Sequence, residues 1–340
     1  MKAVRIHEHG DLEVLKIVDL PEPQAGPGEL LVQIKASGLN HLDTWVRRGV
    51  PGHRFPLPIT PRADGAGVVA ASSSPDFAVG ERVAVAPGFS CGLCAACLSG
   101  QDQYCRRYGT YGETADGTQC EYFVLPPGNA LRIPDALSFE EAAAVPLAFL
   151  TAWEMLMVKA GLREGDTVLV HAAGSGVGSA AIQIARYFNA RVIATAGSEG
   201  KCAKAVQLGA ESAINYREQD FAAELHRLTG RRGADIVLDH VGAATFAGSL
   251  RCLARRGRLV CCGATSGPEI SVNLRPVFFK NLAIIGSTMG SRGTLPRILE
   301  LVAQGAFRPV IDRVMPMTEV AQAHRLLAER EPFGKIILRP

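Results

Sequence analysis

The second half of the chain alternates short β-type runs with helix-like segments about every 20–25 residues. The β-type runs begin at Thr167, Arg191, Ala213, Ala234, Arg258 and Leu282. One segment between them places Val177, Ala181, Ile184, Ala185 and Phe188 on a single apolar helical face. Because regular strand–helix alternation builds βαβ units, this pattern predicts a doubly wound parallel sheet of the α/β class.

A glycine-rich loop follows the first of these strands. The sequence His171-Ala-Ala-Gly174-Ser-Gly176-Val-Gly178-Ser leads directly into a helix, although Ser179 stands at the last position of the strict G-x-G-x-x-G pattern. Glycines let the backbone approach a pyrophosphate, and the helix N-terminus supplies N–H donors and a positive dipole. Alone, such a loop could be a tight structural turn. At the start of a six-strand array it predicts dinucleotide binding.

The second strand of the array lacks the acidic residue that usually binds the ribose 2′-hydroxyl of NAD. Gly197 and Ser198 occupy that place, and we expect Glu199 in the first turn of a helix that Ser198 caps. Lys201 lies close behind. This arrangement favours the 2′-phosphate of NADPH over NADH. The alternative is that Lys201 is only a solvated helix residue.

The first ~130 residues have a different texture, rich in Pro and Gly, with β-type runs at Leu30–Ile34, Gly67–Ala71 and Arg82–Ala86. Ser138-Phe-Glu-Glu141 predicts the start of a helix that continues through the alanines, with a break at Pro146. From about residue 290, one clear helix (Leu295–Gln304) and a β-type run (Lys335–Leu338) are expected to complete the first domain. Since domains average about 150 residues, 340 residues fit two domains. We place them at 1–135 plus 290–340 and at 136–289.

Four of the nine cysteines lie within a lobe at about residues 88–110. Cys91, Cys94, Cys97 and Cys105 have the spacing C-x₂-C-x₂-C-x₇-C, which suits one tetrahedral zinc ion. Disulfides and an iron–sulfur cluster fit the enzyme-like context less well. Four protein ligands leave no position for water or substrate, so this zinc would be structural. The other five, Cys120, Cys202, Cys252, Cys261 and Cys262, are expected to be buried, unreactive thiols.

The charge balance is close to even, with 36 Lys+Arg against 33 Asp+Glu and a net charge of +3. It gives no electrostatic reason to expect nucleic acid or an anionic membrane as a partner. The uncharged stretch 167–185 contains the glycine-rich loop, so it reads as strand, loop and helix rather than as a membrane span. The N-terminus lacks the apolar region of a signal peptide. We expect a soluble, cytoplasmic protein.

These features together resemble the medium-chain dehydrogenase/reductase superfamily, which includes the zinc-type alcohol dehydrogenases and the quinone oxidoreductases. The likeness covers essentially the whole chain and includes, besides the Cys₄ lobe, Met1-Lys-Ala-Val, Gly38-Leu-Asn-His-Leu-Asp43, Asp64-Gly-Ala-Gly67-Val-Val, Val79-Gly-Glu-Arg-Val83, Leu150-Thr151-Ala152, Ala173–Ser179 and Gly334-Lys-Ile-Ile-Leu. The resemblance implies a GroES-like β domain with an inserted Rossmann domain. It also implies an NAD(P)H-dependent oxidoreductase that forms a homodimer or a higher homo-oligomer.

The departures from the zinc alcohol dehydrogenases concern the catalytic metal. Asn40, Ala63 and Leu147 stand where those enzymes have a Cys, a His and a Cys as zinc ligands. None of the three can supply a thiolate or an imidazole, so the resemblance implies no catalytic zinc. Asn40-x-x-Asp43 is similar to the quinone oxidoreductase pattern instead.

Without a Lewis acid, hydride addition to an isolated ketone lacks a means of stabilising the alkoxide. None of the six tyrosines is followed by Lys at +4, so the short-chain reductase solution is missing too. A conjugated acceptor delocalises the charge, and hydrogen-bond donors can stabilise it. We therefore predict NADPH-dependent reduction of a quinone or an α,β-unsaturated carbonyl compound.

The site residues are assigned as follows. Asn40 would donate to the substrate oxygen, and His41 would donate, relay a proton or serve a structural role. Asp43 is more suited to a structural ion pair than to a general base, and Trp45 would line the substrate pocket or pack in the core. By resemblance, the cofactor residues are Thr151 for the nicotinamide, Gly174, Gly176, Val177 and Gly178 for the pyrophosphate, and Ser198, Lys201 and Tyr216 for the 2′-phosphate.

Two alternatives stay open at this point. The first is a zinc-dependent alcohol dehydrogenase that uses unusual ligands such as His41 and Asp64. The second is an NADPH-binding redox sensor or structural protein without turnover. Metal content and reactivity with quinones and enones separate them from the main prediction.

Overall fold

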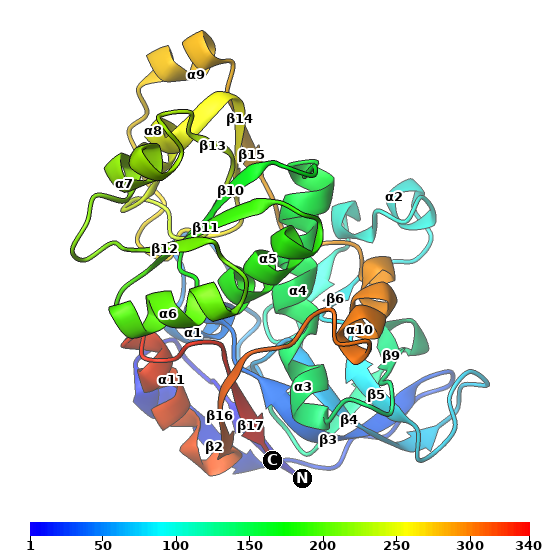
Figure 1. The fold of residues 1–340 in the computed structure, drawn as a ribbon. Helices are drawn as coiled ribbons and strands as arrows, with labels where there is room; N and C mark the ends of the chain where they lie inside the picture. Colours follow the sequence, from blue (N-terminus) through cyan, green and yellow to red (C-terminus); the bar gives the residue numbers. More distant parts are fainter. The chain divides into compact units, whose positions relative to one another are not determined.

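The computed structural model describes residues 1–340 and divides into two units. The first unit contains Met1–Leu150 and Ser291–Pro340, and the second contains Thr151–Gly290. Each unit is built around its own sheet (Figure 1). The C-terminal segment thus returns to the first unit, as the sequence predicts.

The first unit is a mostly antiparallel β structure. Its strands are β1 (Lys2–Arg5), β2 (Lys16–Asp19), β3 (Leu30–Gly38), β4 (Asp64–Ser72), β5 (Arg82–Val85), β6 (Gly88–Phe89), β7 (Gly109–Thr110), β8 (Tyr122–Leu125), β9 (Ala130–Arg132), β16 (Ile311–Pro316) and β17 (Lys335–Arg339). The main sheet has the order β16-β17-β3-β4-β5-β9, with β8 paired to β3, while β1–β2 and β6–β7 form two small sheets. This is the β domain that the Pro- and Gly-rich texture predicts.

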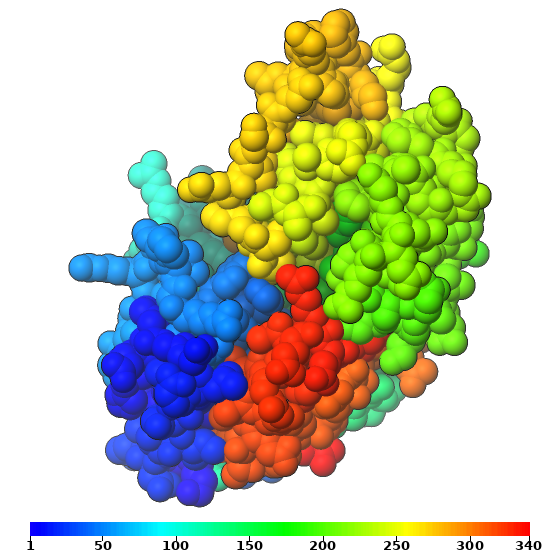
Figure 2. All heavy atoms as spheres, turned by 90° about the vertical axis from the view of Figure 1, so that its left-hand side faces the viewer, coloured from blue at the N-terminus to red at the C-terminus, as the bar shows by residue number.

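Helices close the first unit on several sides. They are α1 (His41–Arg48), α2 (Ala95–Leu98), α3 (Phe139–Ala144), α10 (Leu295–Ala303) and α11 (Val320–Ala328), together with the first residues of α4 (Pro146–Trp153), which continues into the second unit. One apolar core joins Val4 and Ile6, near the N-terminus, to Val320 and Leu326 on α11. Figure 2 shows the orange and red C-terminal residues lying against the blue N-terminal ones.

The second unit is a six-stranded sheet with helices on both faces. Its elements are β10 (Thr167–Val170), α5 (Gly176–Tyr187), β11 (Arg191–Ala196), α6 (Glu199–Gln207), β12 (Ser212–Asn215), α7 (Phe221–Leu228), β13 (Ala234–Asp239), α8 (Phe246–Cys252), β14 (Leu253–Cys261), α9 (Leu274–Lys280) and β15 (Ala283–Gly286), preceded by a π-helical turn at Glu154–Lys159. All neighbouring strands are parallel, in the order β12-β11-β10-β13-β14-β15. Helices α5 and α6 cover one face, and α7 and α8 cover the other (Figure 1). The predicted doubly wound sheet is confirmed.

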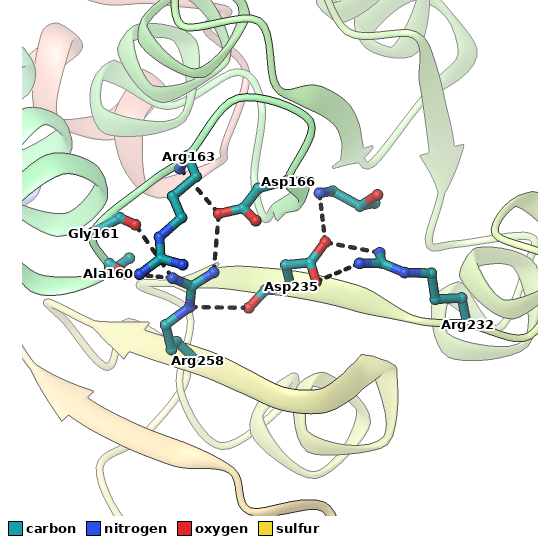
Figure 3. A network of polar contacts seen from close by, with 8 residues as sticks. Ala160, Gly161, Arg163, Asp166, Arg232, Asp235 and Arg258 are labelled. Carbon is teal, nitrogen blue, oxygen red and sulfur yellow. Dashed lines mark hydrogen bonds and ion pairs between the residues drawn. The ribbon is translucent and has the colours of Figure 1, made fainter.

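A polar network fastens the amino-terminal edge of this sheet (Figure 3). The Arg258 guanidinium donates to Asp166 Oδ2 at 2.9 Å and to the Ala160 carbonyl at 2.7 Å. Arg232 makes a bidentate ion pair with Asp235, with N–O distances of 2.8 and 2.7 Å. Bidentate guanidinium–carboxylate geometry fixes orientation as well as distance. The network therefore anchors the edge opposite the glycine-rich loop.

Two expectations from the sequence need correction. The first domain extends to Leu150 rather than to residue 135, because α3 packs directly on β3: a Cβ built at Gly38 would lie 2.5 Å from the Ala143 carbonyl oxygen. The C-terminal segment also holds a second helix, α11, and the strand β16, which the sequence analysis missed. Helix α11 has an apolar face at Val320 and Ala323, and only the packing of that face against the N-terminal residues identifies it.

The structure contains no helix that combines the length and the apolar character needed to span a bilayer.

Candidate active site and cofactor loop

The glycine-rich loop has the geometry of a nucleotide loop. After β10 the backbone turns at Ala172, which has a φ of 48°, and Ser175 then caps α5 by accepting a hydrogen bond from the Gly178 N–H at 2.8 Å. A Cβ at Gly178 would lie 2.3 Å from the Ala172 carbonyl oxygen, so only glycine fits there. Gly174, Gly176 and Val177 complete the loop and the first turn of α5.

The residues predicted for the 2′-phosphate meet at the end of β11. Ser198 caps α6, and its hydroxyl oxygen accepts from the Lys201 N–H at 3.4 Å. A Cβ at Gly197 would lie 2.6 Å from the Tyr216 hydroxyl and 3.5 Å from Arg217 Nε. The structure therefore adds Arg217, an exposed guanidinium that the sequence analysis did not consider.

Glu199 begins α6 and is bonded to a residue at the end of β12. Its carboxylate accepts a hydrogen bond from Asn215 Nδ2 at 3.1 Å. The prediction that Glu199 begins α6 behind a Ser198 cap is confirmed. The end of β11 thus carries hydroxyl and basic groups, while the nearby Glu199 carboxylate is bonded to Asn215.

Asn40 belongs to a buried polar cluster in the first unit. Its Nδ2 donates to Asp64 Oδ2 at 2.8 Å and makes a longer contact of 3.4 Å with the Gly38 carbonyl. Its Oδ1 accepts from Lys335 Nζ at 2.5 Å, and the same ammonium lies 3.0 Å from Asp64 Oδ2. Because the ammonium can only donate and the carboxylate only accept, the orientation of the Asn40 amide is fixed.

Both carboxylate oxygens of Asp64 already have partners. Its Oδ1 accepts from the backbone N–H of Leu147 at 2.9 Å, while Oδ2 holds Asn40 and Lys335. Asp64 and the neighbouring Ala63 are fully buried. A zinc ion at this carboxylate would have to displace a buried ammonium. The residues at the three positions of catalytic zinc ligands therefore do not fit that metal.

Asp43 has a structural position. Its Oδ2 accepts from the Asn40 N–H at 2.8 Å at the start of α1, and its Oδ1 accepts from the Arg62 N–H at 3.1 Å. Burial raises the pKa of Asp43, although the nearby Arg62 guanidinium opposes this shift. The structural interpretation is favoured over a general base, because both carboxylate oxygens hold backbone groups.

His41 opens α1 and is partly exposed, beside Trp45 with ring centroids 5.5 Å apart in an edge-on arrangement. Burial, and then the charges of Arg330 and Arg48, lower the pKa of His41. The imidazole is therefore neutral at pH 7 and can both donate and accept a hydrogen bond. Thr151, predicted to contact the nicotinamide, is buried at the start of the second unit.

The four clustered cysteines form a candidate metal site. The Sγ atoms of Cys91, Cys94, Cys97 and Cys105 all lie within 4.8 Å of one another. The Cys91–Cys97 and Cys94–Cys97 distances are 3.8 and 3.6 Å. Tetrahedral zinc with bonds of about 2.3 Å requires sulfur atoms about 3.8 Å apart. The donor set and its spacing therefore fit one zinc ion.

The other five cysteines differ in burial but share one chemical property. Cys120, Cys202 and Cys252 are buried, whereas Cys261 and Cys262 are only partly so. Burial raises the pKa of every one of these thiols, to about 12 for Cys120, Cys252 and Cys262. All five therefore remain protonated and weakly nucleophilic at neutral pH.

Comparison with known proteins agrees with both units. Residues 26–135 match the family model "Alcohol dehydrogenase GroES-like domain", and residues 176–304 match "Zinc-binding dehydrogenase". The quinone oxidoreductase of Pseudomonas aeruginosa is 34% identical, with the match covering 100% of this chain and 99% of that protein. The chain belongs to the medium-chain dehydrogenase/reductase superfamily. It is an NAD(P)H-dependent oxidoreductase of the zinc-type, alcohol dehydrogenase-like branch.

Other members of the superfamily are also similar over nearly the whole chain. Human quinone oxidoreductase is 30% identical, over 99% of this chain and 97% of that protein. A crystal structure described as an NAD-dependent alcohol dehydrogenase is 50% identical, covers 100% of both chains and has a TM-score of 0.96. The GroES-like and Rossmann architecture predicted from the sequence is thereby confirmed.

Sequence reasoning missed Lys335 as a candidate site residue in this oxidoreductase. The residue lies in the quoted segment Gly334-Lys-Ile-Ile-Leu, which predicts only a terminal strand. Its role follows from the antiparallel pairing of β17 with β3, which joins Ile337 to Gly38 and brings residue 335 beside Asn40 and Asp64. A lysine at the start of the apolar run Ile336–Leu338 was the available signal.

Proposed function

We propose that this protein reduces a quinone or an α,β-unsaturated carbonyl compound with NADPH, without a catalytic zinc ion. The observation that carries the proposal is the Asn40–Asp64–Lys335 cluster. Zinc alcohol dehydrogenases need thiolate and imidazole ligands in this region. Here an amide, a carboxylate and an ammonium group occupy it. A site of this composition supports hydrogen-bond stabilisation rather than Lewis-acid catalysis.

Asn40 is suited to hold the substrate oxygen. One amide hydrogen is committed to Asp64 at 2.8 Å, whereas the other makes only the 3.4 Å contact with Gly38. This second hydrogen has only a weak partner, so it is available to a substrate oxygen without any rotation of the amide. Lys335 and Asp64 keep the amide from flipping, so the donor always faces the same way. NADPH, when bound, supplies the hydride for the β-carbon of the acceptor.

His41 is the candidate for the accompanying proton. Its neutral imidazole can donate a hydrogen bond to the substrate or relay a proton from solvent, because the side chain is partly exposed. Asp43 is left out of the chemistry in this proposal, since it caps α1 and binds the Arg62 N–H. The delocalised charge of an enolate or hydroquinone needs no stronger acid.

The preference for NADPH rests on the end of β11. Ser198, Lys201, Tyr216 and Arg217 surround the position of the missing carboxylate with hydroxyl and basic groups. A 2′-phosphate carries two negative charges at most and accepts several hydrogen bonds, so this set favours it over a 2′-hydroxyl.

The Cys₄ cluster is proposed to hold one structural zinc. Backbone N–H groups of Leu93 and Cys94 lower the pKa of Cys91 to about 5, which supplies one thiolate ligand at neutral pH. Nine free cysteines also suit a reducing compartment, so the proposal keeps the predicted cytoplasmic location.

A homodimer is proposed through the edge of the Rossmann sheet. Strand β15 ends the sheet order, and Phe278 and Phe279 on the preceding helix α9 are 60% and 67% exposed. Ile284 on β15 is also exposed. An unpaired edge strand bordered by apolar side chains is complementary to a second copy of itself.

One observation favours a second candidate function. The solved relative at 50% identity is described as an NAD-dependent alcohol dehydrogenase. A zinc alcohol dehydrogenase would need a catalytic metal, and the buried Lys335–Asp64 pair argues against one. The preference of that relative for NAD does not decide the cofactor here, because few side chains set the choice between NADH and NADPH.

The decisive experiment measures oxidation of NADPH and NADH with benzoquinones, enones and simple ketones, and zinc content on the same sample. The proposal expects NADPH oxidation by quinones or enones and one zinc per chain. Two zinc ions per chain with turnover of simple ketones alone would establish the alcohol dehydrogenase. Tight NADPH binding without oxidation by any acceptor would establish a sensor.

A further inference from the structure

Three buried polar residues lie side by side at the carboxyl ends of the central strands of the second unit. His171 follows β10, Thr195 is near the end of β11, and Asp239 ends β13. The register pairs Val170 of β10 with Ala194 and with Leu238, so the next residues of the three strands stand level. Backbone bonds from His171 N–H to Leu238 O and from Ala173 N–H to Thr195 O extend the pairing past the strand ends.

The side chains of the three residues point to one face of the sheet. Each lies two residues beyond a core residue, namely Leu169, Ile193 and Val237, which all pack on the side of α7 and α8. Ser249 of α8 and Phe221 of α7 meet the His171 imidazole there, at 2.9 Å and with ring centroids 4.9 Å apart. The imidazole is therefore enclosed on all sides by protein.

Five groups form one continuous line of hydrogen bonds. Thr195 Oγ1 lies 3.0 Å from His171 Nδ1 and 3.3 Å from the Ala172 nitrogen. On the other side, His171 Nε2 lies 2.9 Å from Ser249 Oγ, which in turn lies 2.8 Å from Asp239 Oδ2. The line connects three strands, one helix and the first residue of the glycine-rich turn.

The direction of every bond follows from chemistry. Burial opposes ionisation of Asp239, but hydrogen bonds from the Gly242 N–H and from the Ser249 and Thr245 hydroxyls lower its pKa, so its carboxylate accepts from the Ser249 hydroxyl. Ser249 Oγ is then an acceptor for His171 Nε2–H. Burial lowers the pKa of His171, so the imidazole is neutral and its Nδ1 accepts from the Thr195 hydroxyl. Thr195 Oγ1 finally accepts from the Ala172 N–H.

Both ends of the line control backbone at the nucleotide loop. Asp239 Oδ1 accepts from the N–H groups of Val241 and Gly242 at 2.9 and 3.0 Å, which shapes the turn after β13. At the other end, Ala172 adopts its left-handed φ of 48°, and its carbonyl packs on Gly178. The strand order reverses between β10 and β13, and a dinucleotide binds at such a switch point.

We propose that His171, Thr195 and Ser249 are positioning residues that hold the glycine-rich loop in the geometry required by the cofactor pyrophosphate. The inference rests on the proposed function in so far as the loop binds a nicotinamide dinucleotide. The line of hydrogen bonds acts before any substrate is present, so it determines cofactor affinity rather than the chemical step.

The test uses the isosteric variant Thr195→Val, which removes one hydroxyl, and the helix-compatible variant Ser249→Ala. Cofactor dissociation constants are measured by fluorescence titration, together with kcat at saturating NADPH and the urea midpoint. We expect the dissociation constant to rise about tenfold in each variant, which corresponds to one buried hydrogen bond, while kcat changes less than about twofold. Thr195→Ser should restore wild-type affinity.

Thr167→Val is the matched control, because Thr167 is a buried threonine of the same sheet at the opposite end of β10. It should leave cofactor affinity unchanged even if it lowers the urea midpoint. Long-range ¹H–¹⁵N correlation should show His171 as the neutral Nε2–H tautomer at pH 7.

The inference is overturned if Thr195→Val and Ser249→Ala bind the cofactor as tightly as the wild type does. It is also overturned if Thr167→Val loses cofactor affinity in the same proportion to its fall in urea midpoint. An Nδ1–H or a charged His171 would overturn it as well. If the wild-type protein binds neither NADPH nor NADH, the proposed function itself fails, and this result is distinct because it needs no variant.

Discussion

Lys335 Nζ lies 3.0 Å from Asp64 Oδ2, and the two side chains are only 5% and 0% exposed. The residues are 271 positions apart in the chain. A buried ion pair gains stability only when its remaining hydrogen-bonding groups are satisfied, and here Asn40 and the Leu147 N–H complete the set. The pair therefore joins the last strand of the chain to the site around Asn40.

Removing one member of this pair should destabilise the protein strongly. Lys335→Met leaves the buried Asp64 carboxylate without the ammonium bonded to it, and we expect a loss of about 3–5 kcal/mol in the free energy of unfolding. Urea denaturation checks this value. Adding Asp64→Asn should recover part of the loss, because the unpaired buried charge is then gone.

Lys2→Met is the control for the ion pair. Lys2 pairs with Asp19 at 3.5 Å, but these side chains are 57% and 82% exposed, and an exposed pair contributes little. We expect no measurable loss for this variant. A loss below about 1 kcal/mol for Lys335→Met would show that the buried pair does not hold β17 in place.

The cysteine cluster should bind one zinc ion that supports the lobe around it. Cys97 lies 3.8 and 3.6 Å from two partner sulfur atoms, so Cys97→Ser should abolish zinc binding and lower the melting temperature. Cys202→Ser, at a buried cysteine of the second unit, should keep one zinc per chain. Elemental analysis with thermal denaturation measures both effects. Retention of zinc by Cys97→Ser would contradict the assignment.

The cofactor preference can be tested at the end of β11. Lys201→Ala and Arg217→Ala should each lower kcat/KM for NADPH by about tenfold or more, since each removes one charge-assisted contact. The value for NADH should change little. Lys204→Ala, further along α6, is the control and should affect neither cofactor. A wild-type preference for NADH would contradict this part of the proposal.

The sequence predicts the second unit well because each of its elements carries its own local signal. The run that begins at Thr167 and the apolar face of Val177 to Phe188 are legible without any knowledge of neighbouring elements. The Ser138 capping box was likewise predicted and is confirmed, with Ser138 accepting from the Glu141 N–H. The cysteine cluster was also predicted from a local signal, namely the spacing of its four cysteines.

The remaining features depend on contacts between distant segments. Nothing near Lys335 indicates that β17 pairs with β3, and nothing near residue 139 indicates that α3 packs against Gly38. The His171 line of hydrogen bonds needs the register of three strands, of which β10 and β11 are separated by α5, and β11 and β13 by α6, β12 and α7. Arg217 was missed for the same reason, since its place beside Gly197 depends on the neighbouring strands β11 and β12.

The stability of the protein should fall on acidification partly because of His324. This side chain lies on α11 with no exposed surface, and neither ring nitrogen has a hydrogen-bond partner. Burial, and then the charges of Arg62 and Arg47, lower the pKa of His324 well below its usual value of 6.5. The folded protein keeps the ring neutral while the unfolded chain binds a proton below pH 6.5. Stability is therefore fully present above that pH.

The loss can be assigned to this residue with one variant. As the pH falls from 6.5, one extra proton on the unfolded chain lowers the free energy of unfolding by about 1.4 kcal/mol per pH unit. His324→Gln cannot titrate, so its slope between pH 6.5 and 5 should be smaller by up to that amount. His7→Gln, at an exposed position of the same unit, is the control. Equal slopes for wild type and His324→Gln in urea denaturation would mean that His324 is protonated in the folded protein, and that Arg62 and Arg47 do not suppress its charge.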